Sequence, residues 1–397
     1  MVNSKMMPET TGLGSTIALF TANTIERLPW PDTIDGAYAR SYLLPLIQNG
    51  PSHFIDNVQA TCMALMIDGQ IVLPLSLNEQ EYENSYVCSP YSHYVTYARE
   101  ELVLIKQPWL RYTLSLLIDG FGLLCKACHI NRAVHVNNWL LSTNLYPDLT
   151  AEQIEPMLAF LRVRFPRHTL IFRSLNNYTN ETLVNALRRA GCKLVPSRQV
   201  YFVRPANSAY ANAKARWLVK RDFALLERQG YAIVTADELK DEDVPRLVAL
   251  YNALYLEKYS RNNPMFNEHF MRLALSQKTL QLVALKKNER IDAVLGYFCR
   301  NGVMTTPVFG YDTTLPKEVG LYRMLSAVLY SIARENGHLI HSSSGAAEFK
   351  RNRGASASIE YSAVYERHLP WCRRLCWIVL SVLLEKIGLP IMQKYRY

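Results

Sequence analysis

The chain has 397 residues, of which 49% are hydrophobic and 20% are charged. This composition is typical of globular proteins and excludes disordered and fibrous classes, and the length predicts two or three domains. The formal net charge of +10 is uneven, because residues 1–205 carry 17 Lys/Arg and 16 Asp/Glu, whereas residues 206–397 carry 27 and 18. The second half is therefore expected to attract a phosphorylated cosubstrate, RNA or a membrane surface, unless the charge only keeps a face soluble.

The eight cysteines are scattered, and the first residues show no secretory pattern. A disulfide framework is not expected in a chain of this length, so we predict a reducing cytoplasmic location. The stretch Cys125-Lys126-Ala127-Cys128-His129 matches the spacing of a c-type haem attachment site, but it ends an apolar segment. We expect core cysteines there, and we predict no metal site because a second ligand pair at suitable spacing is missing.

The first half alternates strand and helix signals, taken in chain order. The elements are a hairpin over 62–77 that turns at Asp68-Gly69, a buried helix over 108–124, a helix over 150–165 with a capping-box start, a strand over 169–175, a helix over 180–191 and a strand over 200–204. The segment 204–217 is small and polar, and we place a domain boundary there, after residue 205.

The second half gives an ordered series of elements. They are a strand over 231–235, helices over 241–259 and 264–276, strands over 281–287, 291–299 and 303–311, a helix over 319–337, a strand over 338–343, a short helix over 346–352 and a strand over 359–368. Asn301-Gly302 is a strong hairpin signal between two of these strands. The predicted order is β-α-α-β-β-β-α-β-α-β, which is more specific than any single motif in the chain.

This order over 231–368 is similar to the acyltransferase fold of the GNAT superfamily. The stretch SSSGAAEFKRNRGA (342–355), followed by YSAVY, resembles the branch that holds the FemAB-type peptidoglycan-bridge transferases and the CelD-like acetyltransferase domains. The resemblance implies an α/β fold with a mixed sheet flanked by helices. Because that branch is known for tandem units, it also implies a diverged acceptor-side unit over 1–205 and an acyltransferase domain over 206–368. The composition of residues 369–397 predicts a separate basic, apolar helix at the C-terminal end.

GNAT enzymes hold the donor's pyrophosphate on a loop of pattern [Q/R]-x-x-G-x-[G/A] between the fourth strand and the long helix. The corresponding stretch here runs from Lys317 to Tyr322, with Gly320 in place and Tyr322 where a small residue is usual. The resemblance implies that the donor is bound by Lys317, Gly320, Leu321, Tyr322 and Arg323, and by Phe309 and Gly310 of the preceding strand. Backbone N–H groups at a helix start and a Lys suit an anion, although the loop could also be purely structural.

Acyl transfer to an amine needs a base and a donor of hydrogen bonds to the developing oxyanion. The resemblance implies that the oxyanion donor is a backbone N–H near Val308, Phe309 or Gly310, where Pro307 and Gly310 bracket an expected irregularity of the strand. The nearest candidate acid–base residues are Asp312, Tyr311 and Glu318. Asp312-Thr313-Thr314 is also good turn chemistry.

Two basic segments remain. Lys350, Arg351 and Arg353 could clamp a phosphate or carboxylate, or could simply complement a helix dipole. The tail 371–397 combines a run that is apolar apart from Ser381, residues 375–384, with basic flanks. It could anchor at the inner face of the cytoplasmic membrane or dock on the first domain as a buried helix.

The function predicted from the resemblance is N-acyl transfer from acyl-CoA or a related thioester to an amine of a small molecule or a cell-envelope precursor. Acetyl-CoA is the expected cosubstrate, and an acyl-carrier protein is another possible donor. Two alternatives stay open at this point. One is aminoacyl transfer from aminoacyl-tRNA, and the other is an inactive fold that serves as a membrane-associated binding module.

Overall fold

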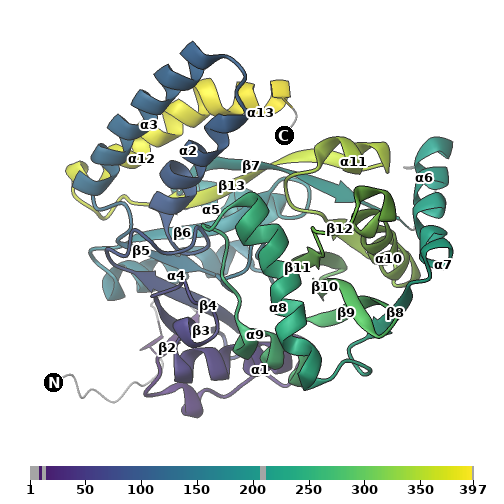
Figure 1. Cartoon of the computed structure of the whole chain (residues 1–397). Helices are drawn as coiled ribbons and strands as arrows, with labels where there is room; N and C mark the ends of the chain where they lie inside the picture. Colours follow the sequence, from purple (N-terminus) through teal and green to yellow (C-terminus); the bar gives the residue numbers. More distant parts are fainter. Residues whose placement is uncertain (1–8, 11–14, 206–211, 396–397) are drawn as a thin grey trace. The chain divides into compact units, whose positions relative to one another are not determined.

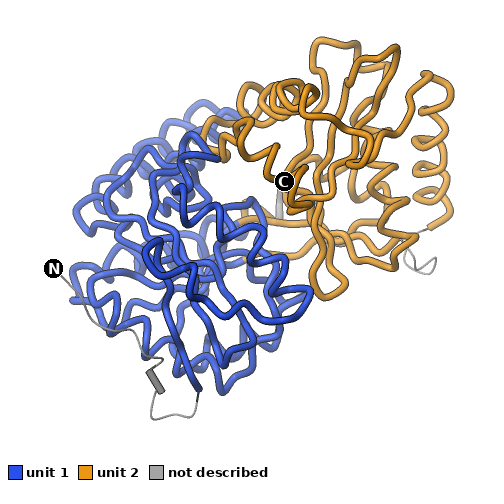
Figure 2. Tube along the Cα trace, turned by 90° about the horizontal axis from the view of Figure 1, so that it is seen from below, with its two compact units in different colours: residues 1–197, 361–389 blue, residues 198–360, 390–397 orange. Residues whose placement is uncertain are grey.

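The computed structural model describes residues 9–10, 15–205 and 212–395. The chain divides into two compact units, unit 1 with residues 1–197 and 361–389 and unit 2 with residues 198–360 and 390–397 (Figure 2). The division falls inside two strands, β7 (Lys193–Val203) and β13 (Ser356–Tyr365), so each unit holds a part of both. The sequence placed the first boundary after residue 205 and set 369–397 apart, whereas residues 361–389 belong to unit 1.

Unit 1 is built on a mixed sheet. Its strands are β1 (Glu9–Thr10), β2 (Thr16–Phe20), β3 (Thr61–Ile67), β4 (Ile71–Asn78), β5 (Ala133–Val136) and β6 (Thr169–Asn176). Strands β1 to β5 pair in chain order as antiparallel neighbours, and β6 then pairs with β5 in parallel. Its helices are α1 (Ile34–Asn49), α2 (Tyr97–Glu101), α3 (Pro108–Ala127), α4 (Ala151–Arg164), α5 (Glu181–Arg189) and α12 (Trp371–Leu383) (Figure 1).

Unit 2 repeats this plan. Its strands are β8 (Ala232–Thr235), β9 (Gln281–Lys287), β10 (Arg290–Arg300), β11 (Val303–Tyr311) and β12 (Leu339–His341). Strands β8 to β11 are antiparallel neighbours, β12 pairs with β11 in parallel, and the end of β7 pairs with β12. Its helices are α6 (Ala213–Phe223), α7 (Leu225–Gln229), α8 (Val244–Asn252), α9 (Glu268–Ser276), α10 (Leu321–Glu335) and α11 (Ala347–Asn352), and the chain closes with α13 (Leu389–Tyr395).

In both units an antiparallel run of strands is followed by one parallel pair, and a single helix joins that pair. The helix is α4 between β5 and β6 in unit 1, and α10 between β11 and β12 in unit 2. A shorter helix and a long strand follow in each case, α5 with β7 and α11 with β13. The predicted fold class, α/β with a mixed sheet flanked by helices, is confirmed, and the repeated topology agrees with two tandem units.

Three predicted helices differ from the structure. The helix predicted over 241–259 is α8, preceded by a 3-10 turn and continued by a π-helix over Ala253–Tyr259. The helix predicted to begin at Pro264 begins at Glu268, because the Asn267 side chain accepts hydrogen bonds from the first backbone N–H groups of α9. The prediction of a buried helix over 108–124 is wrong, since only Phe121, Gly122 and Cys125 of α3 are buried.

Each unit has its own apolar core. In unit 1 one cluster gathers side chains of β2 to β6, α4 and α5. A second cluster includes Cys125 and Cys128 with Cys376 and Trp377 of α12, so the prediction of core cysteines at the haem-like motif is confirmed. In unit 2 the inner face of α10, including Leu321, Met324 and Leu325, packs on β9 to β12.

Candidate active site

Strand β11 leaves its parallel neighbour halfway along its length. It pairs with β12 only from Val303 to Thr305, and the described residues show no parallel partner for 306–311. On its other edge the register to β10 shifts, so that Thr306 and Pro307 lie opposite the single residue Tyr297. Two residues against one define a β-bulge, which bends the strand that carries it. The irregularity predicted near Pro307 is therefore present and coincides with the point where the two strands separate.

The bulge leaves backbone groups of β11 free on the separated edge. The N–H of Asp312 donates to the Asp292 carbonyl of β10 at 2.8 Å. Because successive N–H groups of a strand point to opposite edges, those of Gly310 and Val308 also face β10, whereas that of Phe309 faces the edge that β12 has left. Among the three residues predicted to supply an oxyanion donor, the geometry favours Phe309.

Gly310 has a packing role that the sequence did not reveal. A Cβ atom at this position would lie 2.5 Å from the carbonyl oxygen of Leu250 in α8. Real Cβ atoms essentially never approach backbone that closely, so only glycine lets α8 rest directly on β11. Gly310 thus fixes the position of the strand.

The predicted anion loop forms a helix start whose backbone groups are uncapped. Residues Lys317–Val319 make a 3-10 turn, and Gly320, with φ of 79° in the left-handed region, is the N-cap of α10. No side chain of the described residues caps this end. Lys317 and Glu318 are exposed beside it, and within the described chain no ion pair is formed by either. Free N–H groups, the positive end of the helix dipole and a free lysine together suit an anion.

The first turn of α10 also carries apolar groups. Leu321 is buried in the unit 2 core. The Tyr322 ring packs against Phe309 and Phe349, with centroids 5.4 and 4.7 Å apart, and lies 6.2 Å from the ring of Tyr311. Burial raises the pKa of Tyr322 far above its usual range, so the phenol stays neutral. An aromatic wall therefore lines the helix start next to the free edge of β11.

Arg323 and Arg353, two of the predicted anion-binding arginines, are bound to one buried carboxylate. Arg323 Nε and Nη2 donate to Asp222 Oδ1, both at 2.7 Å. Arg353 Nε donates to Asp222 Oδ2 at 2.7 Å, and its Nη2 makes a further short contact with the same oxygen. This carboxylate of α6 neutralises one of the two positive charges and orients both guanidinium groups. Neither arginine is a free phosphate ligand in this arrangement.

Lys350 and Arg351 are held in a similar way. Lys350 is buried, and its Nζ donates to the carbonyls of Ser342 and Ser344 at 2.6 and 2.8 Å. Burial, with the charge of Arg198, lowers the pKa of Lys350 to about 7. Arg351 donates to the Tyr201 hydroxyl at 3.2 Å. Lys350 therefore fixes the loop that follows β12 rather than presenting an exposed cation.

The region 213–351, which contains the separated strands and the helix start, matches the sequence profile of the acetyltransferase (GNAT) domain family. This segment is a GNAT domain. No curated protein matches the chain in a sequence search. The predicted resemblance is confirmed for these residues, and an acyltransferase-type domain is established within unit 2.

The solved structures that match this chain in a structural comparison share little sequence with it. The C-terminal domain of a putative lysylphosphatidylglycerol synthetase from Agrobacterium fabrum is 12% identical, with a TM-score of 0.42 over 59% of this chain and 77% of that one. L-PGS from Bacillus licheniformis is 16% identical, with a TM-score of 0.44 over 58% and 78%. FemX is 8% identical, with a TM-score of 0.41 over 55% and 78%.

Asp312, the first predicted base of the GNAT domain, is a buried carboxylate in a network with two partly exposed arginines. Its carboxylate accepts from Arg246 Nη2 at 2.8 Å, from the Thr314 N–H at 3.0 Å and from Arg290. Asp292 binds the same two arginines. Burial alone would raise the pKa of Asp312, but the hydrogen bonds from Thr314 and Arg246 outweigh it and hold this pKa well below its usual range. A carboxylate so strongly stabilised in its ionised form is a poor proton acceptor.

The other two predicted acid–base residues differ in availability. The Tyr311 hydroxyl accepts a hydrogen bond from Lys258 Nζ at 3.1 Å. Glu318 is exposed on the 3-10 turn, and the described residues make no ion pair with it. Of the three predicted acid–base residues, Glu318 is the one whose side chain has no partner among the described residues.

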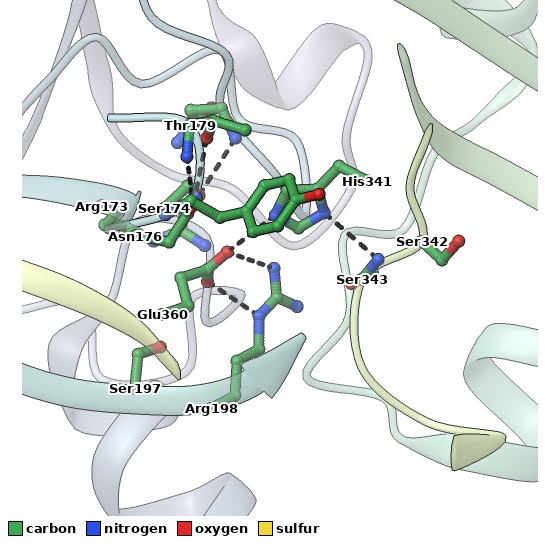
Figure 3. Close-up of polar contacts among 12 residues, drawn as sticks. Arg173, Ser174, Asn176, Thr179, Ser197, Arg198, His341, Ser342, Ser343 and Glu360 are labelled. Atoms are coloured by element: carbon green, nitrogen blue, oxygen red, sulfur yellow. Dashed lines mark hydrogen bonds and ion pairs between the residues drawn. The ribbon is translucent and has the colours of Figure 1, made fainter. Parts of the chain in front are cut away.

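Sequence reasoning missed a second buried charge cluster at the end of β12. Figure 3 shows Glu360 beside Arg198, which donates through Nε at 2.8 Å and Nη2 at 3.4 Å. His341 Nε2 lies 3.5 Å from Oε2 of this carboxylate, and its Nδ1 accepts from the Ser343 N–H at 3.2 Å. Burial would raise the pKa of Glu360, but the charge of Arg198, followed by His341, lowers it to about 2. His341 therefore holds the β12 loop through Nδ1, whereas its buried Nε2 makes no hydrogen bond with the described residues and lies next to the Glu360 carboxylate.

A cavity of about 750 Å³ lies on another side of α10 in the GNAT domain. Its wall includes apolar Val219, Phe223 and Tyr330, and its basic residues include Lys220 and Arg334. No residue of the loop 317–322 lines it. This cavity is therefore separate from the helix start that carries Lys317.

Proposed function

We propose that the GNAT domain of this chain transfers an acyl group from a thioester donor, in the first place acyl-CoA, to an amine. The observation that carries the proposal is the combination of a free strand edge at Phe309 with the uncapped start of α10 at Lys317–Gly320 in the segment that matches the family. The first supplies a donor to a carbonyl oxygen, and the second supplies an anion site.

The chemistry assigns a role to each group. Phosphates of the donor bind the N–H groups at the start of α10 and the Lys317 ammonium, and the thioester oxygen accepts the Phe309 N–H. The neutral amine attacks the carbonyl carbon, a C–N bond forms and the C–S bond breaks, and the thiolate leaves and takes up a proton. An alkylamine at pH 7 must first lose a proton at a cost of roughly 4.6 kcal/mol. Glu318 is the candidate that remains for this step, either directly or through water.

Donor binding is the first test. The melting temperature is measured with and without CoA and acetyl-CoA, because a ligand at 100 times its dissociation constant stabilises a protein by about 2.7 kcal/mol. We expect stabilisation of the wild type, a strong loss in Lys317→Glu and no loss in Lys214→Glu, which changes an exposed lysine of α6 in the same way. Unchanged stabilisation in Lys317→Glu would remove the loop from the donor site.

Turnover separates chemistry from binding. Thiol release from acetyl-CoA is followed with a panel of amines, and Glu318→Gln is expected to lower kcat while leaving the dissociation constant of CoA unchanged. If CoA neither stabilises the chain nor reacts, the donor is another carrier. The surplus of 27 Lys/Arg over 18 Asp/Glu in residues 206–397 would then favour aminoacyl-tRNA, whose binding should weaken steeply with salt.

A further inference from the structure

Helix α3 of unit 1 presents an apolar stripe to solvent along its whole length. Trp109, Tyr112, Leu116 and Leu123 are between 55% and 72% exposed. Their spacing of three, four and seven residues places them on one face of the helix. The opposite face supplies the buried Phe121 and Cys125. Soluble proteins rarely leave so long a run of large apolar side chains uncovered.

Helix α12 adds a second stripe to the same part of unit 1. Trp371 is 74% exposed, and Ile378 and Val382 follow it at helical spacing with 43% and 52% exposure. Arg373 at the start of α12 donates to the carbonyls of Cys128 and His129, directly after the end of α3, at 2.7 and 3.2 Å. Figure 1 shows the two helices side by side, and their inner faces share one core cluster.

The charges around these helices favour one kind of partner. Residues 99–126 and 371–388 carry seven Lys/Arg and four Asp/Glu. Lys106 and Arg111 are exposed at the start of α3, and Lys126 is exposed at its end. Asp119, the acid within the helix, is paired with Arg99 at 2.7 Å. An apolar face with basic ends and exposed Trp and Tyr is the pattern of a segment that lies in a membrane interface.

We infer that α3 and α12 together form a docking surface for a lipid membrane with anionic headgroups. The exposed stripes enter the boundary between headgroups and acyl chains, while Lys106, Arg111 and Lys126 meet the anionic headgroups. This surface belongs to unit 1 and does not depend on the chemistry proposed for unit 2.

The helices lie on the membrane rather than cross it. By length and composition, Trp371–Met392 is long and apolar enough to span a bilayer. However, Cys376, Trp377 and Leu380 of α12 are buried in the core of unit 1, and Trp377 Nε1 donates to Thr169 Oγ1 at 3.3 Å. A spanning helix would have to remove these side chains from that core. The face that they occupy is therefore committed to protein, and only the outer face is available to lipid.

The test is co-sedimentation of the full chain with vesicles of phosphatidylcholine, with or without phosphatidylglycerol. We expect pelleting with the anionic vesicles that weakens as salt is raised. Leu123→Glu in α3 and Val382→Glu in α12 should each lower the partition coefficient about tenfold or more, since each places a charge where an exposed apolar side chain would enter the lipid. Val163→Glu is the matched control, because Val163 is 77% exposed in α4 of the same unit.

Several results would overturn the inference. One is the absence of pelleting with both vesicles, and another is an equal loss in Val163→Glu. A chain that stays in the membrane after alkaline extraction and is unaffected by Leu123→Glu would instead contain a spanning helix. A dimer in solution that Leu123→Glu dissociates, without vesicle binding, would show that a second copy covers the face. Circular dichroism of each variant identifies any that fails to fold. In that case Trp109→Phe is used instead, and the expected result is that brominated lipid quenches less tryptophan fluorescence than in the wild type.

Discussion

Replacing Asp222 by asparagine should destabilise the GNAT domain strongly. The carboxylate is almost completely buried and accepts hydrogen bonds from both Arg323 and Arg353. Asparagine keeps the shape of the side chain but removes its negative charge. The amide NH2 group, a hydrogen-bond donor, would face a guanidinium group, which is also a donor. The Arg353 side chain is only 6% exposed, whereas that of Arg323 is 33% exposed and can turn outward.

Breaking a buried ion pair from one side costs about 3–5 kcal/mol. Because only Arg353 is left fully stranded, we expect a loss of about 4 kcal/mol in the free energy of unfolding, or roughly 10 °C in melting temperature. Urea denaturation of the full chain, followed by circular dichroism, measures it. The matched control is Asp237→Asn, whose carboxylate pairs with Lys278 at 3.0 Å but is 79% exposed, and which should cost less than about 1 kcal/mol.

A double variant tests the cause. In Asp222→Asn with Arg353→Met the stranded charge is gone, so part of the lost stability should return. A loss in Asp222→Asn no larger than that in Asp237→Asn would refute the reasoning. The same result would reopen Arg323 and Arg353 as ligands for an anion, because their charges would not be tied to Asp222.

Gly310→Ala should lower the free energy of unfolding, measured by urea denaturation, by about 3 kcal/mol or more, because its methyl group would collide with the Leu250 carbonyl. The control is Gly120→Ala in the exposed part of α3, which should raise the free energy of unfolding by about 0.5–1 kcal/mol. A mild cost at Gly310 would mean that α8 can move. The pKa of Glu360 is about 2 in the folded chain against an ordinary 4.5, so its contribution is complete above about pH 4.5 and is lost as the pH falls toward 2. The shift corresponds to about 3 kcal/mol, and Glu360→Gln should lose less stability than the wild type between pH 5 and pH 3 in the same assay; equal losses would contradict the assigned pKa.

Local patterns in the sequence predicted the parts of the site that are local in the chain. Asn301-Gly302 forms the expected hairpin turn, with φ of 50° and 71° at the two residues. The spacing from Lys317 to Gly320 identified the start of α10, because the turn and the helix are continuous in sequence. Pro307 identified the bulge in β11 for the same reason, since a residue without an N–H disturbs a ladder wherever it stands.

The pairing of charges could not be predicted, because it joins residues far apart in the chain. Asp222 binds Arg323 and Arg353, which lie 101 and 131 positions away. A signal of burial was present, since Asp222 follows Ala215 and Leu218 at helical spacing on the inner face of α6, but nothing local says which cation meets it. The prediction that α3 is buried was wrong for a different reason. The helix carries large apolar side chains on two opposite faces, so its pattern cannot tell the face in the core from the one exposed to solvent.

The helix that joins the parallel strands of unit 1, α4, starts differently from α10. The segment 137–150 before α4 is largely buried, and it contains no glycine, whereas unit 2 places Gly320 at this point. The Thr150 N–H at the start of α4 donates to Gln153 Oε1 at 3.1 Å, and Glu152 puts a negative charge in the first turn, where a phosphate would have to bind.

We therefore expect one CoA per chain, measured as a stoichiometry of about one by isothermal titration calorimetry, and complete loss of binding in Lys317→Glu. A stoichiometry near two, with one site surviving in Lys317→Glu, would show that both units bind the donor. It would also contradict the use of a capped, acidic helix start as a criterion for the absence of an anion site.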